Sequence, residues 1–284
     1  MFAASAFFSI TPHSLASQIL YGGVGNSATS PGAVVIIDQS TGAGTVVGTP
    51  NNAGGITGFA FNSLGQLFAT VSPQGQSTAF LEQIDPVTFA EIGSPVSLSA
   101  DPNIGDLTFQ PNTDILFGVS NNRSSAPGTI YTINTTTGVE TLIGNPASGT
   151  GGGLAFAPDG TLYYANFTLF TLNPINASVL SQVALTPSLV IDGLGIRADG
   201  VLFANVGQGN DSIYTIDPTT GASTLVGSIG GGNRVSDLDF LTTPEPGTNA
   251  LMALGGLALL AGRWLTKSRL QGRLGTLWAN SRQR

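Results

Sequence analysis

The segment that decides the fold runs from residue 191 to residue 227. It reads IDGLGI at 191–196, GVLFAN at 200–205, SIYTID at 212–217, PTTGA at 218–222 and STLVG at 223–227. Four short segments are rich in β-branched and aromatic residues, and Gly, Pro, Asp or Asn lies between them. This pattern is typical of four β-strands joined by tight turns.

The same succession of segments recurs along the chain. It starts at Ile56, Ile104, Gly151 and Ile191, with start-to-start separations of 48, 47 and 40 residues. Units of four strands at this spacing are typical of the blades of a β-propeller. We therefore predict an all-β fold, a β-propeller, over residues 17–242.

The number of blades follows from the candidate innermost strands, at residues 56–61, 104–109, 152–156, 191–196 and 235–240. Residues 18–22, 33–38 and 44–48 form a blade without an innermost strand, whereas 235–240 is an innermost strand without a blade. We predict that these two parts combine, which gives five four-stranded blades and closes the ring without unpaired strand edges. The alternatives are six blades, with a divergent one within residues 22–50, a β-sandwich, or an open stack of sheets.

The turn before the last strand of each unit has its own signature. It is DPTTG at 217–221, NTTTG at 134–138 and DQSTG at 38–42, with shorter forms that begin at Asp85 and Asn173. An Asp or Asn side chain accepts hydrogen bonds from the backbone two residues on, and Gly supplies the positive φ that closes the turn. We interpret these Asp and Asn residues as turn formers.

The two ends of the chain differ from the repeats between them. Residues 1–10 are apolar and small residues follow at 14–17, so we interpret residues 1–16 as a signal-peptide-like segment, although no Lys or Arg precedes the apolar run. Near the other end, two prolines are followed by an uncharged segment over 250–262 and then by basic residues. This order predicts a short transmembrane helix whose basic flank stays in the cytoplasm.

The C-terminal order of motifs resembles the PEP-CTERM sorting domain. The resemblance rests on Pro244, Glu245 and Pro246 and on the membrane-flanking Arg263, Lys267 and Arg269. It implies that residues 243–284 are a sorting tail recognised by an exosortase and cleaved near the tripeptide. The protein would then be exported, anchored in the bacterial inner membrane in transit, and delivered to the cell envelope or the extracellular space.

The chain departs from this family in one respect, because it continues to Arg284, farther beyond its basic cluster than is usual. An ordinary tail anchor that follows a Pro-rich linker and is never processed is the alternative. The two interpretations differ only in what happens to the C-terminus.

Charge excludes one class of partner. Residues 1–247 contain three arginines, no lysine and all 16 acidic residues, a net charge of −13, whereas six basic residues and no acidic one follow. Sequence-independent binding to nucleic acid needs clustered Lys and Arg. We therefore expect no nucleic-acid partner for the propeller.

Several kinds of catalytic site lack the residues they need. The only histidine, His13, lies in the signal-like segment, and the chain has no cysteine. Ser-His-Asp and Cys-His catalysis and metal sites built on His or Cys are thereby excluded from the mature propeller.

Carboxylates remain as candidates. The alignment of the innermost strands places Asp106, Asp192, Asp237 and Asp239 near the start of the strands that line the channel. Converging carboxylates would suit Ca²⁺, or would supply the acid and base of a hydrolase resembling lactonase-like propellers. The alternative is that these side chains accept hydrogen bonds from neighbouring backbone amides.

Two hypotheses for function follow. The first is an exported, non-enzymatic binding or structural module without a cofactor, whose loops contact extracellular polysaccharide or protein. The second is a metal-dependent hydrolase with a carboxylate site at the channel. Three or more of the four aspartates around one point would favour the hydrolase.

Overall fold

The fold was analysed in a computed structural model, which describes residues 18–50, 54–73, 79–101, 103–146, 150–207 and 211–242. The signal-like segment, the Pro-Glu-Pro tripeptide, the expected hydrophobic helix and its basic flank lie outside these residues. No helix in the described part is long and apolar enough to cross a membrane.

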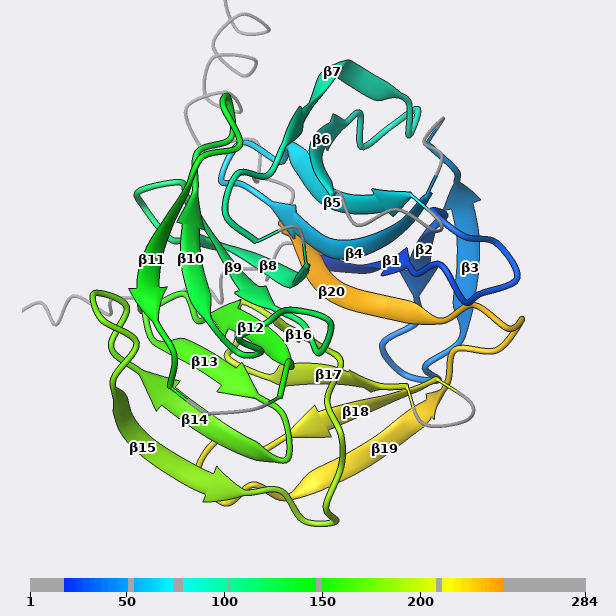
Figure 1. The fold of residues 1–284 in the computed structure, drawn as a ribbon. Helices are drawn as coiled ribbons and strands as arrows, with labels where there is room; N and C mark the ends of the chain where they lie inside the picture. The colour runs from blue at the N-terminus through cyan, green and yellow to red at the C-terminus, as the bar shows by residue number, and fades with distance from the viewer. Residues whose placement is uncertain are drawn as a thin grey trace, which may run out of the picture. The chain divides into compact units, whose positions relative to one another are not determined.

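Twenty strands form five antiparallel four-stranded sheets, which are the five blades of a β-propeller (Figure 1). From the innermost to the outermost strand, blade 1 is β4 (Gly54–Phe61), β5 (Leu67–Pro73), β6 (Phe80–Ile84) and β7 (Glu91–Ser97); blade 2 is β8 (Ile104–Gln110), β9 (Ile115–Ser120), β10 (Ile130–Ile133) and β11 (Glu140–Gly144); blade 3 is β12 (Gly153–Phe156), β13 (Leu162–Ala165), β14 (Thr168–Leu172) and β15 (Val179–Ala184). Blade 4 is β16 (Gly193–Ile196), β17 (Leu202–Val206), β18 (Ser212–Ile216) and β19 (Ser223–Ser228); blade 5 is β20 (Val235–Thr242), β1 (Gln18–Val24), β2 (Val34–Ile37) and β3 (Gly44–Gly48).

Blade 5 joins the two ends of the propeller domain. Strand β20 pairs antiparallel with β1, from Gln18 opposite Thr242 to Gly23 opposite Asp237. The innermost strands contact one another in the ring order β4, β8, β12, β16 and β20, and β20 contacts β4 in turn (Figure 1). The predicted five blades and their shared closing blade are therefore confirmed, and the sandwich, the open stack and the six-bladed ring are not observed.

Apolar side chains fill the interfaces between blades. The buried residues form five clusters, each drawn from two neighbouring blades. Aromatic pairs bridge four of these interfaces, with ring centroids 5.0–5.5 Å apart: Phe68–Phe109, Phe117–Phe156, Phe203–Phe240 and Tyr21–Phe61. Packing between blades thus holds the ring together.

The turn signatures also act as expected. Asp217 Oδ1 accepts hydrogen bonds from the Thr219 and Thr220 amides at 2.8 and 3.1 Å, and Asp38, Asp85 and Asn134 make the same pair of bonds. Gly221 has a φ of 72°. These residues are turn formers, as predicted from the sequence.

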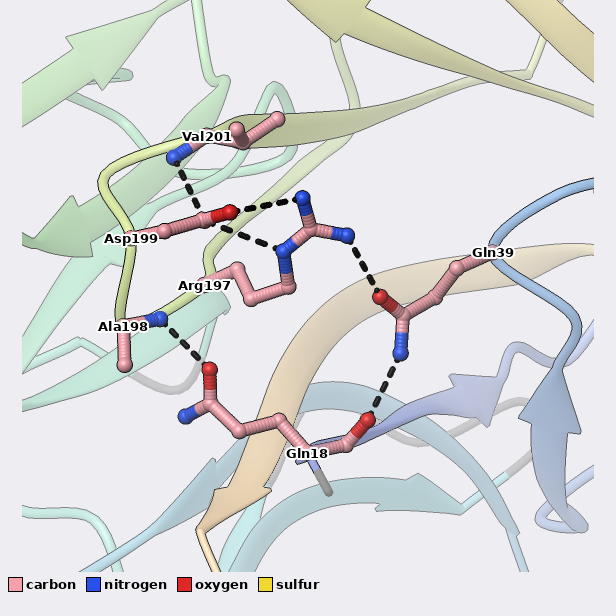
Figure 2. A network of polar contacts seen from close by, with 6 residues as sticks. All are labelled: Gln18, Gln39, Arg197, Ala198, Asp199 and Val201. Atoms are coloured by element: carbon pink, nitrogen blue, oxygen red, sulfur yellow. Dashed lines mark hydrogen bonds and ion pairs between the residues drawn. The ribbon is translucent and has the colours of Figure 1, made fainter. Parts of the chain in front are cut away.

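A polar network ties blade 4 to blade 5 (Figure 2). The Arg197 guanidinium forms an ion pair with Asp199 at 2.8 Å and donates to Gln39 Oε1 at 2.9 Å. Gln39 Nε2 donates to the Gln18 carbonyl at 2.7 Å, and the Ala198 amide donates to Gln18 Oε1. Gln18, the first residue of β1, is therefore held by blade 4 as well as by β20.

Candidate functional site

The centre of the propeller is formed by one equivalent position in each innermost strand. We call these five residues the hub: Gly58, Asp106, Gly153, Gly193 and Asp237. Glycine is required where the strands approach closely, since a Cβ on Gly193 would lie 2.6 Å from the Asp237 Cα atom. Three glycines thus leave room at the axis for two carboxyl groups.

Between them, the two hub carboxyls accept hydrogen bonds from five backbone amides. Each amide belongs to the residue that follows one hub position. Asp237 Oδ2 accepts from Phe59 at 2.6 Å and Leu107 at 2.9 Å, and Asp237 Oδ1 accepts from Leu238 at 2.6 Å. Asp106 Oδ2 accepts from Leu154 at 3.0 Å and Leu194 at 3.1 Å. Each of the five blades therefore donates one amide to a carboxyl at the axis.

The two hub carboxyls, Asp106 and Asp237, also influence each other's protonation. Both side chains are fully buried, and Asp106 Oδ1 has no hydrogen-bond partner. Burial is the largest cause that raises the pKa of both groups well above the ordinary range, and the negative charge of Asp237 raises the pKa of Asp106 further. A proton on Asp106 Oδ1, donated to Asp237, would give this oxygen the hydrogen-bond partner that it lacks.

Asp239 occupies the next layer along the axis. Its Oδ2 accepts from the Phe61 amide at 2.7 Å and its Oδ1 from its neighbour Phe240 at 2.8 Å. Burial raises the pKa of Asp239 to about 7. Like the hub carboxyls, Asp239 accepts hydrogen bonds from the backbone of an adjacent blade.

The four aspartates considered from the sequence do not converge on one point. Three of them accept hydrogen bonds from backbone amides, namely Asp106, Asp237 and Asp239. The fourth, Asp192, lines the pocket described below. Among the described residues, no group of three or more His, Cys, Asp or Glu side chains could hold a metal ion. For Asp106, Asp237 and Asp239, the geometry matches the alternative in which the carboxylates accept hydrogen bonds from neighbouring backbone amides.

A cavity of about 250 Å³, the axial pocket, opens where the innermost strands begin. The residues that immediately precede the five hub positions all line this pocket. They are Thr57, Gly105, Gly152, Asp192 and Ser236. The strand register shifts at three of these five positions, in β4, β8 and β20. Bulges of this kind turn side chains out of the regular alternation and are frequent beside functional sites.

Loops from several blades form the rim of the axial pocket. Asn26 is fixed in the β1–β2 loop, because it donates to the Ser72 carbonyl at 2.8 Å and accepts from the Gly55 amide at 2.7 Å. Asn122 in the β9–β10 loop accepts from Gly151 at 2.7 Å. The rim is therefore tied to the starts of the innermost strands.

Four charged residues line the axial pocket. Arg123, Arg234 and Asp192 are exposed, whereas Asp211 is only 7% exposed. Burial raises the pKa of Asp211 to about 6; the nearby Arg234 lowers it, and Asp192 raises it. Desolvation also raises the pKa of Asp192, whereas a hydrogen bond from the Gly207 amide and the positive charge of Arg234 lower it.

Sequence reasoning identified Asp192 in this pocket but missed Arg123, Asp211 and Arg234. These residues come from loops, whose positions the strand pattern does not determine. One signal was present, because two of only three arginines before residue 247 lie in segments that connect strands at the same end of the blades.

The comparisons with known proteins assign neither a family nor a function to this chain. No protein-family model and no curated protein matches the chain. Among solved structures, the chain is similar to the glutaminyl cyclase of Myxococcus xanthus, with 18% identity over 65% of this chain and 69% of that one and a TM-score of 0.43. A protein of unknown function from Bacteroides caccae has 11% identity over 80% and 99% of the two chains, with a TM-score of 0.49.

A third similar structure is a putative gluconolactonase, with 17% identity over 78% of this chain and 80% of that one and a TM-score of 0.48. These three identities and TM-scores are too low to transfer a reaction or a ligand to this chain.

Proposed function

We propose that this chain is an exported propeller of the bacterial cell envelope that binds extracellular polysaccharide through its axial pocket, without catalysing a reaction. The observation that carries the proposal is the lining of that pocket. Apart from Val235, every lining residue is Gly, Asn, Ser, Thr, Asp or Arg. Such a surface offers hydrogen-bond donors and acceptors to a hydroxyl-rich ligand and little to an apolar one.

The tail supports the destination in this proposal. The order of Pro244, Glu245 and Pro246, the uncharged segment and the basic residues resembles the PEP-CTERM signal, whose recognition by an exosortase would place the propeller outside the inner membrane. A polymer on the cell surface is a ligand that such a protein would meet.

The test is cosedimentation of the full-length protein with extracellular polysaccharide purified from its host. Ser27 is exposed on the pocket rim, so Ser27→Trp should obstruct the cavity and reduce the bound fraction at least tenfold. The control is Leu64→Trp, because Leu64 is 75% exposed in the β4–β5 turn, outside the pocket lining. Equal binding by both variants, or no binding by the native protein, would contradict the proposal.

One observation favours a hydrolase as a second candidate. Two carboxyls with raised pKa values, Asp192 and Asp211, lie beside Arg234 in the same pocket, and groups of this kind serve as acids and bases in hydrolysis. Release of soluble sugars or opened lactones by the native protein, lost in Asp211→Asn, would favour this candidate. Its dependence on a metal is tested by repeating the assay with added Ca²⁺ and with a chelator.

A further inference from the structure

Two of the arginines in the propeller, Arg123 and Arg234, form no close ion pair with a carboxylate of the described residues. The propeller contains one other basic residue, Arg197, and it is engaged by Asp199 and Gln39 at the joint between blades 4 and 5 (Figure 2). In the described part of the chain, no carboxylate lies within 4.0 Å of Arg123 or Arg234. Both side chains are exposed, and both line the axial pocket.

The placement of these cations is informative because the rest of the propeller is strongly acidic. An acidic surface repels anions in general, and a local pair of arginines offsets that repulsion at one place. The planar guanidinium group binds carboxylates through two parallel hydrogen bonds, which makes Arg well suited to them. A neutral sugar would not need either cation.

Recognition in this pocket relies on polar groups, because no aromatic side chain lines it. Stacking of a sugar ring against an aromatic face is therefore not available among the described residues. Asn121, Asp192, Asp211 and Ser236 supply hydrogen-bonding groups for hydroxyls around the two arginines.

We propose that the axial pocket binds an acidic sugar unit of the polysaccharide, with the sugar carboxylate held by Arg123 and Arg234 and its hydroxyls held by Asp192, Asp211 and Ser236. This inference rests on the proposed function, since it names the sugar that the same pocket takes. A group with a single negative charge suits the pocket better than a dianion, because the two aspartates repel additional negative charge.

The pocket also makes binding dependent on pH. The charged residues that line the pocket are Arg123 from the β9–β10 loop, Asp192 before β16, Asp211 before β18 and Arg234 before β20. Burial raises the pKa of Asp211 to about 6, so this carboxyl loses its charge as the pH falls below that value. Repulsion between Asp211 and the sugar carboxylate then disappears, and binding of the acidic sugar becomes stronger at pH 5 than at pH 7.5.

The experiment compares a tetramer of galacturonic acid with its methyl-esterified form by calorimetric titration of the full-length protein. Esterification removes the charge and retains the sugar ring and its hydroxyls. We expect the free acid to bind at least tenfold more tightly than the ester, and Arg123→Gln or Arg234→Gln to abolish this preference. The control is Leu142→Glu, which also changes the net charge by −1 but alters an exposed residue of the outermost strand β11.

The outcomes separate this inference from the proposed function. Equal affinity for acid and ester, with both lost in Ser27→Trp, would overturn the acidic sugar and leave the pocket as a polysaccharide site. A preference for the acid that persists in both arginine variants would overturn the assignment to Arg123 and Arg234. Failure of the host polysaccharide itself to bind would overturn the proposed function.

Discussion

At the scale of single residues, Asp106 and Asp237 have different roles although both are fully buried at the hub. Asp237 accepts hydrogen bonds from three amides and Asp106 from two. If the two carboxyls share one proton, Asp106 is its donor and Asp237 its acceptor. An asparagine at position 106 reproduces this arrangement, because its oxygen accepts the Leu154 and Leu194 amides and its nitrogen donates to Asp237. An alanine at the same position reproduces none of it.

Two substitutions at position 106 should therefore differ sharply. Asp106→Asn should leave the free energy of unfolding at pH 7 close to that of the native protein. Asp106→Ala should lower it by about 2–4 kcal/mol, because two buried amides lose their acceptor. Urea denaturation of the full-length variants measures both values, and equal losses in the two variants would contradict the shared proton.

The same carboxyls determine how stability depends on pH. The hub aspartates and Asp239 have pKa values raised above the unfolded value of about 3.9, and that of Asp239 reaches about 7. Between about pH 4 and pH 7 the native state consequently binds more protons than the unfolded state, and stability falls as the pH rises. The turn aspartates act in the opposite sense below about pH 4, because hydrogen bonds lower their pKa values. The Ser40 hydroxyl is the main cause for Asp38, and backbone amides are the main cause for Asp85 and Asp217.

We expect maximum stability near pH 4–5, on the acidic side of neutrality. Urea midpoints measured from pH 3 to pH 8 test this expectation. In Asp106→Asn the decline in the urea midpoint towards pH 7 should be smaller, because the variant lacks the Asp106 carboxyl and its raised pKa. A midpoint that increases steadily from pH 4 to pH 8 would contradict the raised pKa values.

At the scale of elements, the joint between blades 4 and 5 combines two kinds of contact with unequal energies. Phe203 in β17 is 2% exposed and packs against Phe240 of β20, and the Arg197 guanidinium lies 5.4 Å from the Phe203 ring centre. The ion pair of Arg197 is about one-third exposed. Burial of the aromatic ring should dominate, because exposed ion pairs contribute little in water.

Replacement of these two residues gives a quantitative test. Phe203→Ala should lower the free energy of unfolding by about 3–5 kcal/mol, and Arg197→Ala by about 1 kcal/mol or less. Thermal and urea denaturation of both variants measure the difference. A loss in Arg197→Ala as large as that in Phe203→Ala would show that the network in Figure 2 contributes more than its exposure indicates.

The elements were largely predictable from the sequence, and the pocket was not. Segments 104–109 and 235–240 became β8 and β20, because alternating apolar residues and turn residues specify strands locally. The meeting of Asp106 with Asp237, by contrast, depends on closure of the ring. Asp211 and Arg234 adjoin Asp192 only through loops, whose course depends on the assembled blades.

At the scale of the whole molecule, the proposed sorting tail leads to a prediction about the mature chain. If an exosortase processes the tail, intact-mass analysis of protein from the native host should give a mass that ends near residues 244–246, in fractions outside the inner membrane. The propeller should be unaffected, because its last strand ends at Thr242. A full-length mass through Arg284 confined to the inner membrane would indicate an unprocessed tail anchor instead.

The closing strand β20 also determines when the protein can fold. It is the last strand of the propeller to be synthesised, yet its Asp237 accepts the amides of Phe59 in blade 1 and Leu107 in blade 2. Until β20 arrives, the nascent chain holds blades with unsatisfied donors at their centre and an exposed edge on β1. Contacts this distant along the chain form slowly, so the native ring should appear only after translation of the propeller is complete.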